Sequence, residues 1–268
     1  MTTAEIESLL DTAHALADAA RAPILSRFRS TDLVADNKRT EGFDPVTAAD
    51  REAEAAMRAV LAARRPDDAI LGEEAGETAG TSGLTWVLDP IDGTRSFLCG
   101  APVFGVLIAV HDGARPIIGL IDQPYTGERF VGVKSAGLAE MTRGAARRPL
   151  KVRRGRPLDQ AILLSTFPQI GTPTERAGFE AVSARARLTR FGLDCYAYAL
   201  LALGQIDLVI EAGLHAYDIQ APLAVIEAAG GVVTDWRGGP ADRGGQVIAA
   251  GDPALHRETL ALLAPFAR

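Results

Sequence analysis

The stretch from Trp86 to Phe97 places the strongest constraint on how this chain can fold. Its apolar beginning, Trp86–Leu88, is typical of a buried strand, and it stops at two acidic residues, Asp89 and Asp92. Carboxylates are almost never fully buried unless they are paired or bound to a metal. Two of them at the end of a buried strand therefore indicate a cation site, and hard oxygen ligands favour Mg²⁺ over zinc or copper.

The composition is that of an ordinary globular chain of 268 residues, with 47% hydrophobic and 23% charged residues. The net charge of −6 argues against a general nucleic-acid binder. The start of the chain lacks the pattern of a signal peptide, and no apolar run approaches the roughly 20 residues that span a bilayer. Cys99 and Cys195 form no disulfide framework, so we expect a cytoplasmic protein without a membrane partner.

Two amphipathic helices are predicted near the N-terminus, over residues 4–28 and 48–64. The polar segment between Asp32 and Phe43 is expected to be a loop. Thr47 and Asp50 have the spacing of a capping pair for the second helix. Asp50 therefore has a structural interpretation as a helix-start acid, beside any role in chemistry.

Short strands are predicted at 69–71 and 84–88, and the turn after the first one contains Glu73 between two glycines. If the two strands are neighbours in a sheet, Glu73 and Asp89 leave the same end and converge on one ion. Residues 103–133 then show strands separated by tight turns, which predicts an antiparallel meander.

The arginine-rich segment 143–156 contains few apolar residues. We interpret it as a solvated edge between two halves of the molecule, 1–146 and 147–268, rather than as a nucleic-acid patch. The second half alternates in pattern, which predicts crossover connections and a mostly parallel or mixed sheet between helices. The expected strands are 161–165, 188–191, 207–211, 232–234 and 247–250, and the expected helices are 174–184, 195–203, 217–229 and 254–263.

Several motifs, taken together, resemble those of the inositol monophosphatase superfamily. They are Asp44–Asp50 (D-x-V-T-x-x-D), Gly72–Glu74, Trp86–Thr94 (WVLDPIDGT), Tyr217-Asp218 and Ala228–Gly231. Three further segments are similar to the histidinol-phosphate phosphatase branch of that superfamily: Asp92–Phe97, Gly119–Phe130 and Asp194–Tyr198.

The resemblance implies an α/β fold with α-β-α-β-α layers, in which the N-terminal half has an antiparallel sheet and the C-terminal half a mostly parallel or mixed one. It also implies a homodimer and two or three Mg²⁺ ions per site. Glu73, Asp89 and the carbonyl of Ile91 would hold a first ion, while Asp89, Asp92 and Asp218 would hold a second. Two ions sharing a carboxylate would neutralise a phosphate, activate a water and stabilise the leaving alkoxide.

The expected catalytic residues are Asp50, Glu73 and Thr94. Thr94 and Asp50 would orient and help to deprotonate the attacking water, with Glu73 assisting. Gly93 and Thr94 would offer backbone N–H groups to the phosphate at a helix start, and the glycine would permit a close approach.

Four residues are expected to contact the rest of the substrate: Asp194, Glu211, Arg95 and Arg129. The two acids favour a cationic alcohol such as histidinol over a neutral polyol. Asp194 has a rival interpretation as the N-cap of the following helix. The two arginines would touch phosphate or imidazole, or else form surface ion pairs. His215 is interpreted as structural, because the metal mechanism needs no histidine base.

The leading hypothesis is a Mg²⁺-dependent hydrolase of a small phosphomonoester, histidinol phosphate, in histidine biosynthesis. One alternative is the same chemistry on inositol 1-phosphate or on a 3'-phosphoadenosine compound. A hypothesis of another class is a non-catalytic regulator that binds phosphometabolites. The sequence speaks against it, because no expected acidic metal ligand has been replaced by a neutral residue. An RNA-associated role of the segment 143–156 is a further, weaker hypothesis.

Overall fold

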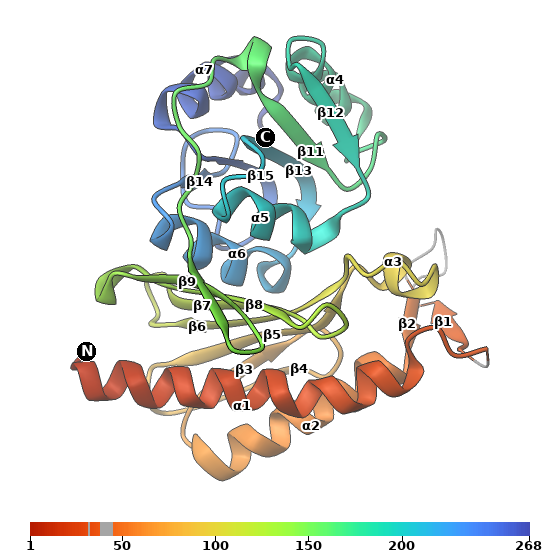
Figure 1. The fold of residues 1–268 in the computed structure, drawn as a ribbon, viewed down its shortest axis with the longest axis vertical. Helices are drawn as coiled ribbons and strands as arrows, with labels where there is room; N and C mark the ends of the chain where they lie inside the picture. The colour runs from red at the N-terminus through yellow and green to blue at the C-terminus, as the bar shows by residue number, and fades with distance from the viewer. Residues whose placement is uncertain (32, 38–44) are drawn as a thin grey trace.

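The computed structural model describes residues 1–31, 33–37 and 45–268. Its helices and sheets stack in five layers, which confirms the predicted α/β class (Figure 1). Helices α1 and α2 cover one face of an eight-stranded sheet, and α5 and α6 lie between that sheet and a five-stranded one. Helices α4 and α7 cover the outer face of the second sheet. No helix in the described part of the chain combines the length and apolarity needed to cross a membrane.

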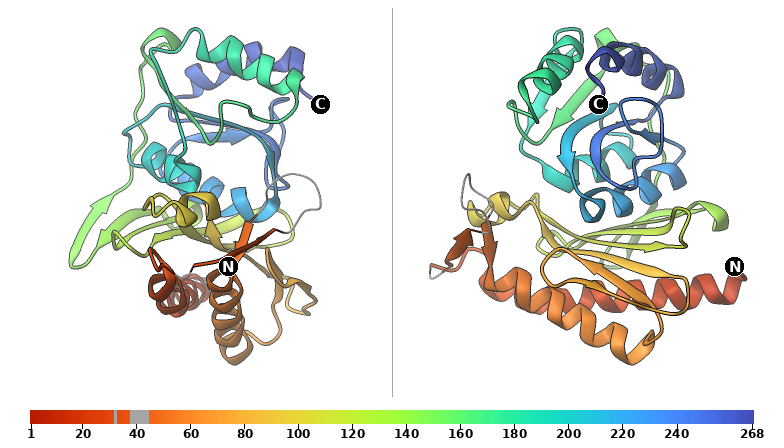
Figure 2. Two further views of the ribbon diagram at one scale, coloured as in Figure 1. Left: turned by 90° about the vertical axis from the view of Figure 1, so that its right-hand side faces the viewer. Right: turned by 180° about the vertical axis from the view of Figure 1, so that it is seen from behind.

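The first layer consists of α1 (Thr3–Arg27) and α2 (Ala48–Arg64), which pack side by side under the first sheet (Figure 2). Apolar residues at helical spacing bury one face of each helix, as the sequence predicted. Thr47 and Asp50 form the predicted capping box at the start of α2. The helix start therefore holds Asp50 in a fixed place.

The connection from α1 to α2 contains two short strands, β1 (Ala35–Asn37) and β2 (Pro45–Thr47), which pair antiparallel. The expectation of a loop is therefore wrong at 35–37, where a polar strand pairs outside both main sheets. Asp32 and residues 38–44 lie outside the described residues, and these include Asp44 of the D-x-V-T-x-x-D motif.

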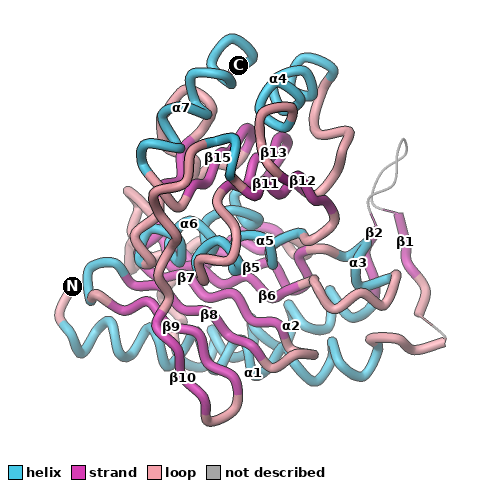
Figure 3. Tube along the Cα trace, turned by 45° about the horizontal axis from the view of Figure 1, so that its top comes forward, coloured by secondary structure: helices cyan, strands magenta, loops and turns pink. Residues whose placement is uncertain are grey.

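The first sheet has the strand order β10-β9-β8-β7-β6-β5-β3-β4, and Figure 3 shows β10 to β5 side by side. It is antiparallel except for the parallel pair β3 and β5. The register pairs Gly72 with Leu88, so the turn after β3 lies beside Asp89, as predicted. Strand β4 was not predicted, because its sequence, Gly-Glu-Thr, has no apolar alternation. The strands are β3 (Ala69–Gly72), β4 (Gly76–Thr78), β5 (Thr85–Asp92), β6 (Gly105–His111), β7 (Pro116–Gln123), β8 (Glu128–Val133), β9 (Leu138–Arg143) and β10 (Ala146–Pro149).

The second sheet has the order β12-β11-β13-β15-β14 and is mixed, since β12, β11 and β13 are parallel whereas β15 is antiparallel to both of its neighbours. The predicted elements of this half are present, with ends that differ by a few residues. The strands are β11 (Ile162–Ser165), β12 (Leu188–Phe191), β13 (Leu208–Leu214), β14 (Val232–Thr234) and β15 (Gly245–Ala250). The helices are α4 (Pro173–Ser183), α5 (Asp194–Ala202), α6 (Ala216–Ala228) and α7 (Pro253–Leu263), and the short α3 (Thr94–Leu98) follows β5.

The arginine-rich segment begins as the exposed edge strand β10 and continues as an extended link to the second sheet. Arg153 is not a free cation, because its guanidinium forms an ion pair with the buried Asp207. The boundary at 146/147 lies within β10, whose pairing belongs to the first sheet. That the two halves are separate domains stays a prediction.

Helix α6 lies directly on the first sheet through two glycines. Gly119 of β7 and Gly132 of β8 are cross-strand partners. A Cβ atom on Gly119 would lie 2.3 Å from the carbonyl oxygen of Ala221, and one on Gly132 would lie 2.4 Å from the Cα of Val225. Both contacts are with the backbone of α6, so the helix approaches only because these side chains are absent.

Replacing Gly119 or Gly132 with alanine is expected to lower the free energy of unfolding by about 1–3 kcal/mol, because a new methyl group must displace backbone atoms of α6. Equilibrium urea unfolding of the variants and the wild type measures this change. An unchanged midpoint and slope would show that α6 can move away from the sheet without cost.

Candidate metal centre and substrate cavity

A cavity of about 310 Å³ opens between the two halves, at the end of β5 and the start of α6. Residues from both halves line it, and most of the polar ones are acidic. The lining residues are Glu73, Asp92, Gly93, Thr94, Arg95, Thr166, Phe167, Asp194, Glu211, Ala212, Gly213, Leu214, His215, Tyr217 and Asp218.

Three carboxylates meet at the floor of this cavity. Asp89 and Asp92 come from the end of β5, and Asp218 comes from the first turn of α6. One oxygen of each lies within 4.8 Å of the other two. The backbone N–H of Ile91 donates to Asp89 Oδ1 at 3.0 Å, and that of Cys195 donates to Asp92 Oδ2 at 2.6 Å. The N–H of His215 donates to Asp218 Oδ2 at 2.7 Å, so backbone groups fix all three side chains.

The electrostatics of this cluster fit a bound cation. Burial raises the pKa of Asp89 and Asp92 well above the usual range, and the neighbouring carboxylates of Glu73, Asp194 and Asp218 raise these pKa values further. Several carboxylates this close cannot all ionise without a balancing positive charge. Hard oxygen donors in this number match Mg²⁺, so the residues present fit the ion that the family resemblance implies.

Glu73 lines the same cavity from the turn after β3. Its charge raises the pKa of Asp89 and of Asp50, which places its carboxylate beside both. The carbonyl of Ile91 accepts a hydrogen bond from Thr94 Oγ1 at 3.1 Å. The structure therefore brings all the predicted metal ligands to one end of β5.

Asp50 uses its two oxygens for different contacts. Oδ2 accepts hydrogen bonds from Thr47 N at 2.8 Å and Thr47 Oγ1 at 2.5 Å, while Oδ1 lies 3.4 Å from Thr94 Oγ1. Burial raises the pKa of Asp50, and the hydrogen bonds from Thr47 oppose this shift. The helix-cap interpretation and the catalytic interpretation of Asp50 are thus both compatible with one geometry.

Gly93 links the metal cluster to α3 in a left-handed conformation, with φ of 86°. A Cβ atom here would also lie 2.9 Å from the side chain of Asp194. Glycine is needed for the turn and for the approach of Asp194.

Asp194 lies at the start of α5, beside Gly93 and close enough to Asp92 for its charge to raise the pKa of that residue. It is not the N-cap, because the cap residue is Leu193 and no side chain caps this helix. The rival interpretation is therefore wrong. The carboxylate instead accepts a hydrogen bond from Ser96 Oγ at 2.5 Å, and the residue has φ of 45°, an uncommon backbone conformation that aspartate tolerates. Burial raises the pKa of Asp194.

Glu211 is buried at the far side of the cavity and is held by the end of β11. Its Oε1 accepts hydrogen bonds from Thr166 N at 2.6 Å and Thr166 Oγ1 at 2.9 Å, and Ser165 Oγ donates to Oε2 at 3.3 Å. Burial raises the pKa of Glu211 to about 7, because these hydrogen bonds only partly offset the loss of water.

The two predicted arginines have different positions. Arg95 lines the cavity and stacks on the ring of Phe167 at 4.8 Å. Arg129 does not line it, and its guanidinium instead contacts Asp122 and Asp18, each at 2.7 Å. The expectation that Arg129 binds substrate is corrected accordingly: within the described chain it ties α1 to the sheet. The exposed His215 precedes α6 and stacks on Tyr217.

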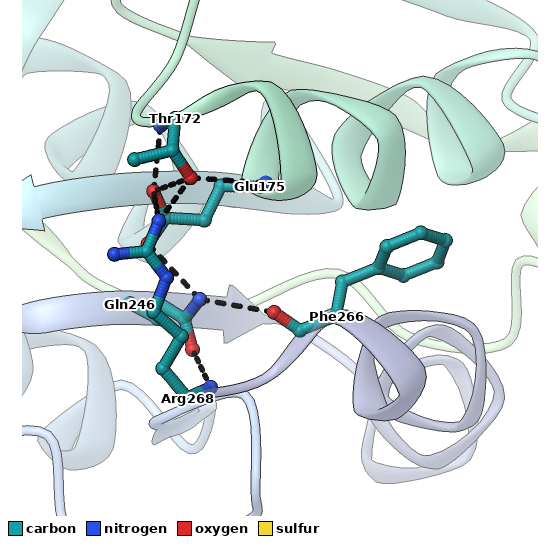
Figure 4. A network of polar contacts seen from close by, with 5 residues as sticks. All are labelled: Thr172, Glu175, Gln246, Phe266 and Arg268. Atoms are coloured by element: carbon teal, nitrogen blue, oxygen red, sulfur yellow. Dashed lines mark hydrogen bonds and ion pairs between the residues drawn. The ribbon is translucent and has the colours of Figure 1, made fainter.

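Sequence analysis missed the cavity wall made by Thr166 and Phe167. The available signal was their place directly after the apolar strand 161–165. This wall continues into the start of α4, which is fixed by polar contacts of Glu175 with Thr172, Gln246 and Arg268 near the C-terminus (Figure 4). The Tyr198 hydroxyl was also missed; it is buried near the acids, without a hydrogen-bond partner among the described residues.

Comparisons with known proteins found matches along nearly the whole chain. The sequence profile of the Inositol monophosphatase family matches residues 5–266. A relative from Arabidopsis thaliana, named bifunctional phosphatase IMPL2, chloroplastic, is 39% identical, with 96% of this chain and 75% of the relative covered. A histidinol-phosphatase from Streptomyces coelicolor is 34% identical, with 94% and 95% covered. A solved structure of an inositol monophosphatase from Zymomonas mobilis matches with a TM-score of 0.84 and 38% identity, covering 98% and 99%.

The raised pKa of Glu211 predicts a dependence of stability on pH. Between the ordinary pKa of 4.5 and the folded value of about 7, the folded state holds a proton that the unfolded state has lost. Stability is therefore lost as the pH rises through this window, by on the order of 3 kcal/mol from this group. Glu211→Gln, which keeps an acceptor for Thr166, is expected to be the more stable protein at pH 8. Urea unfolding in the presence of a chelator at pH 5 and pH 8 measures the free energy of unfolding of both proteins. A difference between wild type and variant that does not change with pH would contradict the prediction.

Asp92→Asn is expected to have opposite effects with and without metal. In a chelator the variant should melt above the wild type, because one of the crowded charges is gone while an amide oxygen can still accept the N–H of Cys195. With Mg²⁺ at about 100 times its dissociation constant, the wild type gains roughly 2.7 kcal/mol. The variant should lose most of that gain. Thermal unfolding in both buffers tests this, and equal Mg²⁺ stabilisation of the two proteins would exclude Asp92 as a ligand.

Proposed function

Because the chain belongs to the inositol monophosphatase family, we propose that it is a Mg²⁺-dependent phosphomonoester hydrolase that acts on histidinol phosphate. The family supports a phosphatase in general, and the finer substrate is the proposal. The observation that carries the choice of substrate is that Asp194 and Glu211 line the same cavity as Glu73, Asp92 and Asp218.

We assign Glu73, Asp89 and the Ile91 carbonyl to one Mg²⁺, and Asp89, Asp92 and Asp218 to another. When bound, these ions would neutralise the phosphate oxygens, lower the pKa of an attacking water and stabilise the leaving alkoxide. The clustering of three of these carboxylates within 4.8 Å supports the assignment.

The proton of the water is assigned to the pair of Thr94 and Asp50. Thr94 Oγ1 lies 3.4 Å from Asp50 Oδ1, so the hydroxyl can accept from the water once its single proton turns from the Ile91 carbonyl to the carboxylate. The raised pKa of Asp50 makes it a better proton acceptor than an ordinary aspartate. Glu73 is assigned an assisting role. The N–H groups of Gly93 and Thr94 are assigned to the phosphate, since they begin α3 at the cavity wall.

The choice of histidinol phosphate rests on charge. Mg²⁺ would balance the acids at the cavity floor, but Asp194 and Glu211 would remain as negative groups around the leaving alcohol. A cationic alcohol with an ammonium and an imidazole offers donors to both acids, whereas a neutral polyol would leave the buried Glu211 without a counter-charge and Asp194 with only the nearby Arg95. The histidinol-phosphatase from Streptomyces coelicolor is one relative whose name agrees with this proposal.

The alternative substrate is inositol 1-phosphate, because the solved inositol monophosphatase is 38% identical to this chain and the histidinol-phosphatase is 34% identical. A 3'-phosphoadenosine compound would use the same metal chemistry. The homodimer and the cytoplasmic location expected from the sequence stay predictions.

Turnover of these three monoesters with Mg²⁺ tests the proposal. We expect kcat/KM for histidinol phosphate to exceed that for inositol 1-phosphate by at least tenfold, which corresponds to about 1.4 kcal/mol. Asp194→Asn should reduce this preference, because it removes one charge while Ser96 keeps an acceptor. A higher kcat/KM for inositol 1-phosphate would refute the assignment of histidinol phosphate as the substrate. Mg²⁺ binding without turnover of any monoester would favour a non-catalytic regulator.

A further inference from the structure

The turn that contains Glu73 is hydrogen-bonded to a second glutamate, Glu54 of α2. Two consecutive N–H groups of the turn donate to its carboxylate: Glu74 N to Oε2 at 2.7 Å and Ala75 N to Oε1 at 3.1 Å. The side chain of Glu54 is only 1% exposed and does not line the cavity. A buried carboxylate therefore holds the backbone directly after Glu73.

Arg58, one helical turn further along α2, completes this arrangement. Its Nε donates to Glu54 Oε1 at 2.7 Å, and its other nitrogens donate to Thr78 Oγ1 at 2.9 Å and to the carbonyl of Gly76. An ion pair at this spacing on an exposed helix contributes only a few tenths of a kcal/mol. Here Glu54 is buried and Arg58 is partly buried, and the pair contacts both the turn and β4, so it connects α2 to them as well as stabilising the helix.

Gly72 makes the close approach of Glu54 possible. A Cβ atom on this residue would lie 2.2 Å from Glu54 Oε1 and 2.7 Å from an Arg58 nitrogen. On its other side the turn is fixed by the sheet, where Glu73 N donates to the carbonyl of Leu88 at 3.1 Å. The backbone of the turn is thus held between β5 and the carboxylate of Glu54.

We propose that Glu54 is a positioning residue, which sets the backbone of residues 73–75 so that the Glu73 carboxylate faces Asp89 in the metal centre. It acts through the turn and touches neither metal nor substrate. This inference rests on the proposed function in one respect, the assignment of Glu73 as a Mg²⁺ ligand. Groups that orient metal ligands typically change metal affinity by 10–100-fold when they are replaced.

The negative charge of Glu54 is needed because all its neighbours are donors. A glutamine offers one carbonyl oxygen, so its NH₂ group would face an N–H of the turn or the guanidinium of Arg58. Glu54→Gln has nearly the same shape but cannot accept all three hydrogen bonds. The turn is then expected to lose a fixed position while α2 remains helical.

Titration calorimetry of the purified full chain with Mg²⁺ alone, and with Mn²⁺ as a second probe, tests the proposal without any turnover. Glu54→Gln is expected to weaken binding by about tenfold or more. With substrate present, the Mg²⁺ concentration for half-maximal activity should rise by the same factor, while kcat at saturating Mg²⁺ changes much less. Amide hydrogen exchange at Glu74 and Ala75 should become faster.

Asp68→Asn is the matched control. Asp68 is also a buried carboxylate next to α2, and it accepts hydrogen bonds from Arg65 at 2.6 Å and from the indole of Trp86 at 2.8 Å. It makes no such contact with the turn of residues 73–75. This variant should lower the melting temperature but leave the Mg²⁺ dissociation constant unchanged.

The inference is overturned if Glu54→Gln loses stability like Asp68→Asn while it binds Mg²⁺ as the wild type does. It is also overturned if the wild type binds neither ion. If Glu54→Gln does not fold, Arg58→Lys replaces it in the experiment. This variant keeps the positive charge but loses the forked contacts of the guanidinium, so it should weaken Mg²⁺ binding about threefold. An unchanged Mg²⁺ affinity of this variant would count against the proposal. A wild type that binds Mg²⁺ but hydrolyses no monoester would refute the proposed function and leave the metal-binding result for Glu54 valid.

Discussion

The mutual repulsion of buried carboxylates at the junction of the two halves is the constraint on which the rest of the structure depends. Asp89 and Asp92 end a strand that is covered on both faces, and Asp218 reaches them from a helix of the other half. Bringing these groups together costs free energy until a cation is bound. The packing of α6 on Gly119 and Gly132 opposes this cost, because it presses the two halves together where the acids would otherwise drive them apart.

The starts of two helices fix the orientation of two of the acidic side chains. Asp50 and Asp218 are both the third residue of a helix, and each accepts the N–H of the residue that caps it, Thr47 or His215. One carboxylate oxygen is used for this contact and fixes the side chain, which leaves the other oxygen for the site. The structural and chemical interpretations of these acids therefore do not compete, because the cap provides the orientation that the chemistry requires.

Much of the fold, and the place of Asp89 and Asp92 in the site, could be predicted from local signals in the sequence, whereas Asp218 was assigned only through the family resemblance. An apolar run that ends in acidic residues, such as Trp86–Asp92, predicts both a buried strand and carboxylates at its end. Glu54 and Arg129 could not be assigned in this way. Their partners lie about 20 and 111 residues away, and a charged residue on a helix or strand looks the same in sequence whether it faces water or fixes a distant element. The role of Gly119 and Gly132 could not be predicted from the sequence either, since only the packed structure shows which atoms of α6 a methyl group would displace.

The two sets of acids in the cavity are kept in place by different means, and this difference bears on selectivity. Backbone N–H groups and a cation can balance the floor acids, whereas Asp194 and Glu211 are held by hydroxyl and amide donors of Ser96 and Thr166. Neutral donors orient a carboxylate but supply no counter-charge, as the raised pKa of Glu211 shows. Arg95 lines the same cavity and its charge lowers the pKa of Asp194, so Glu211 is the acid that is short of positive charge in the free protein. Under the proposed function, a ligand that brings a cation to Glu211 relieves a penalty that a neutral polyol cannot, and Asp194 and Glu211 select among monoesters that share the same metal chemistry.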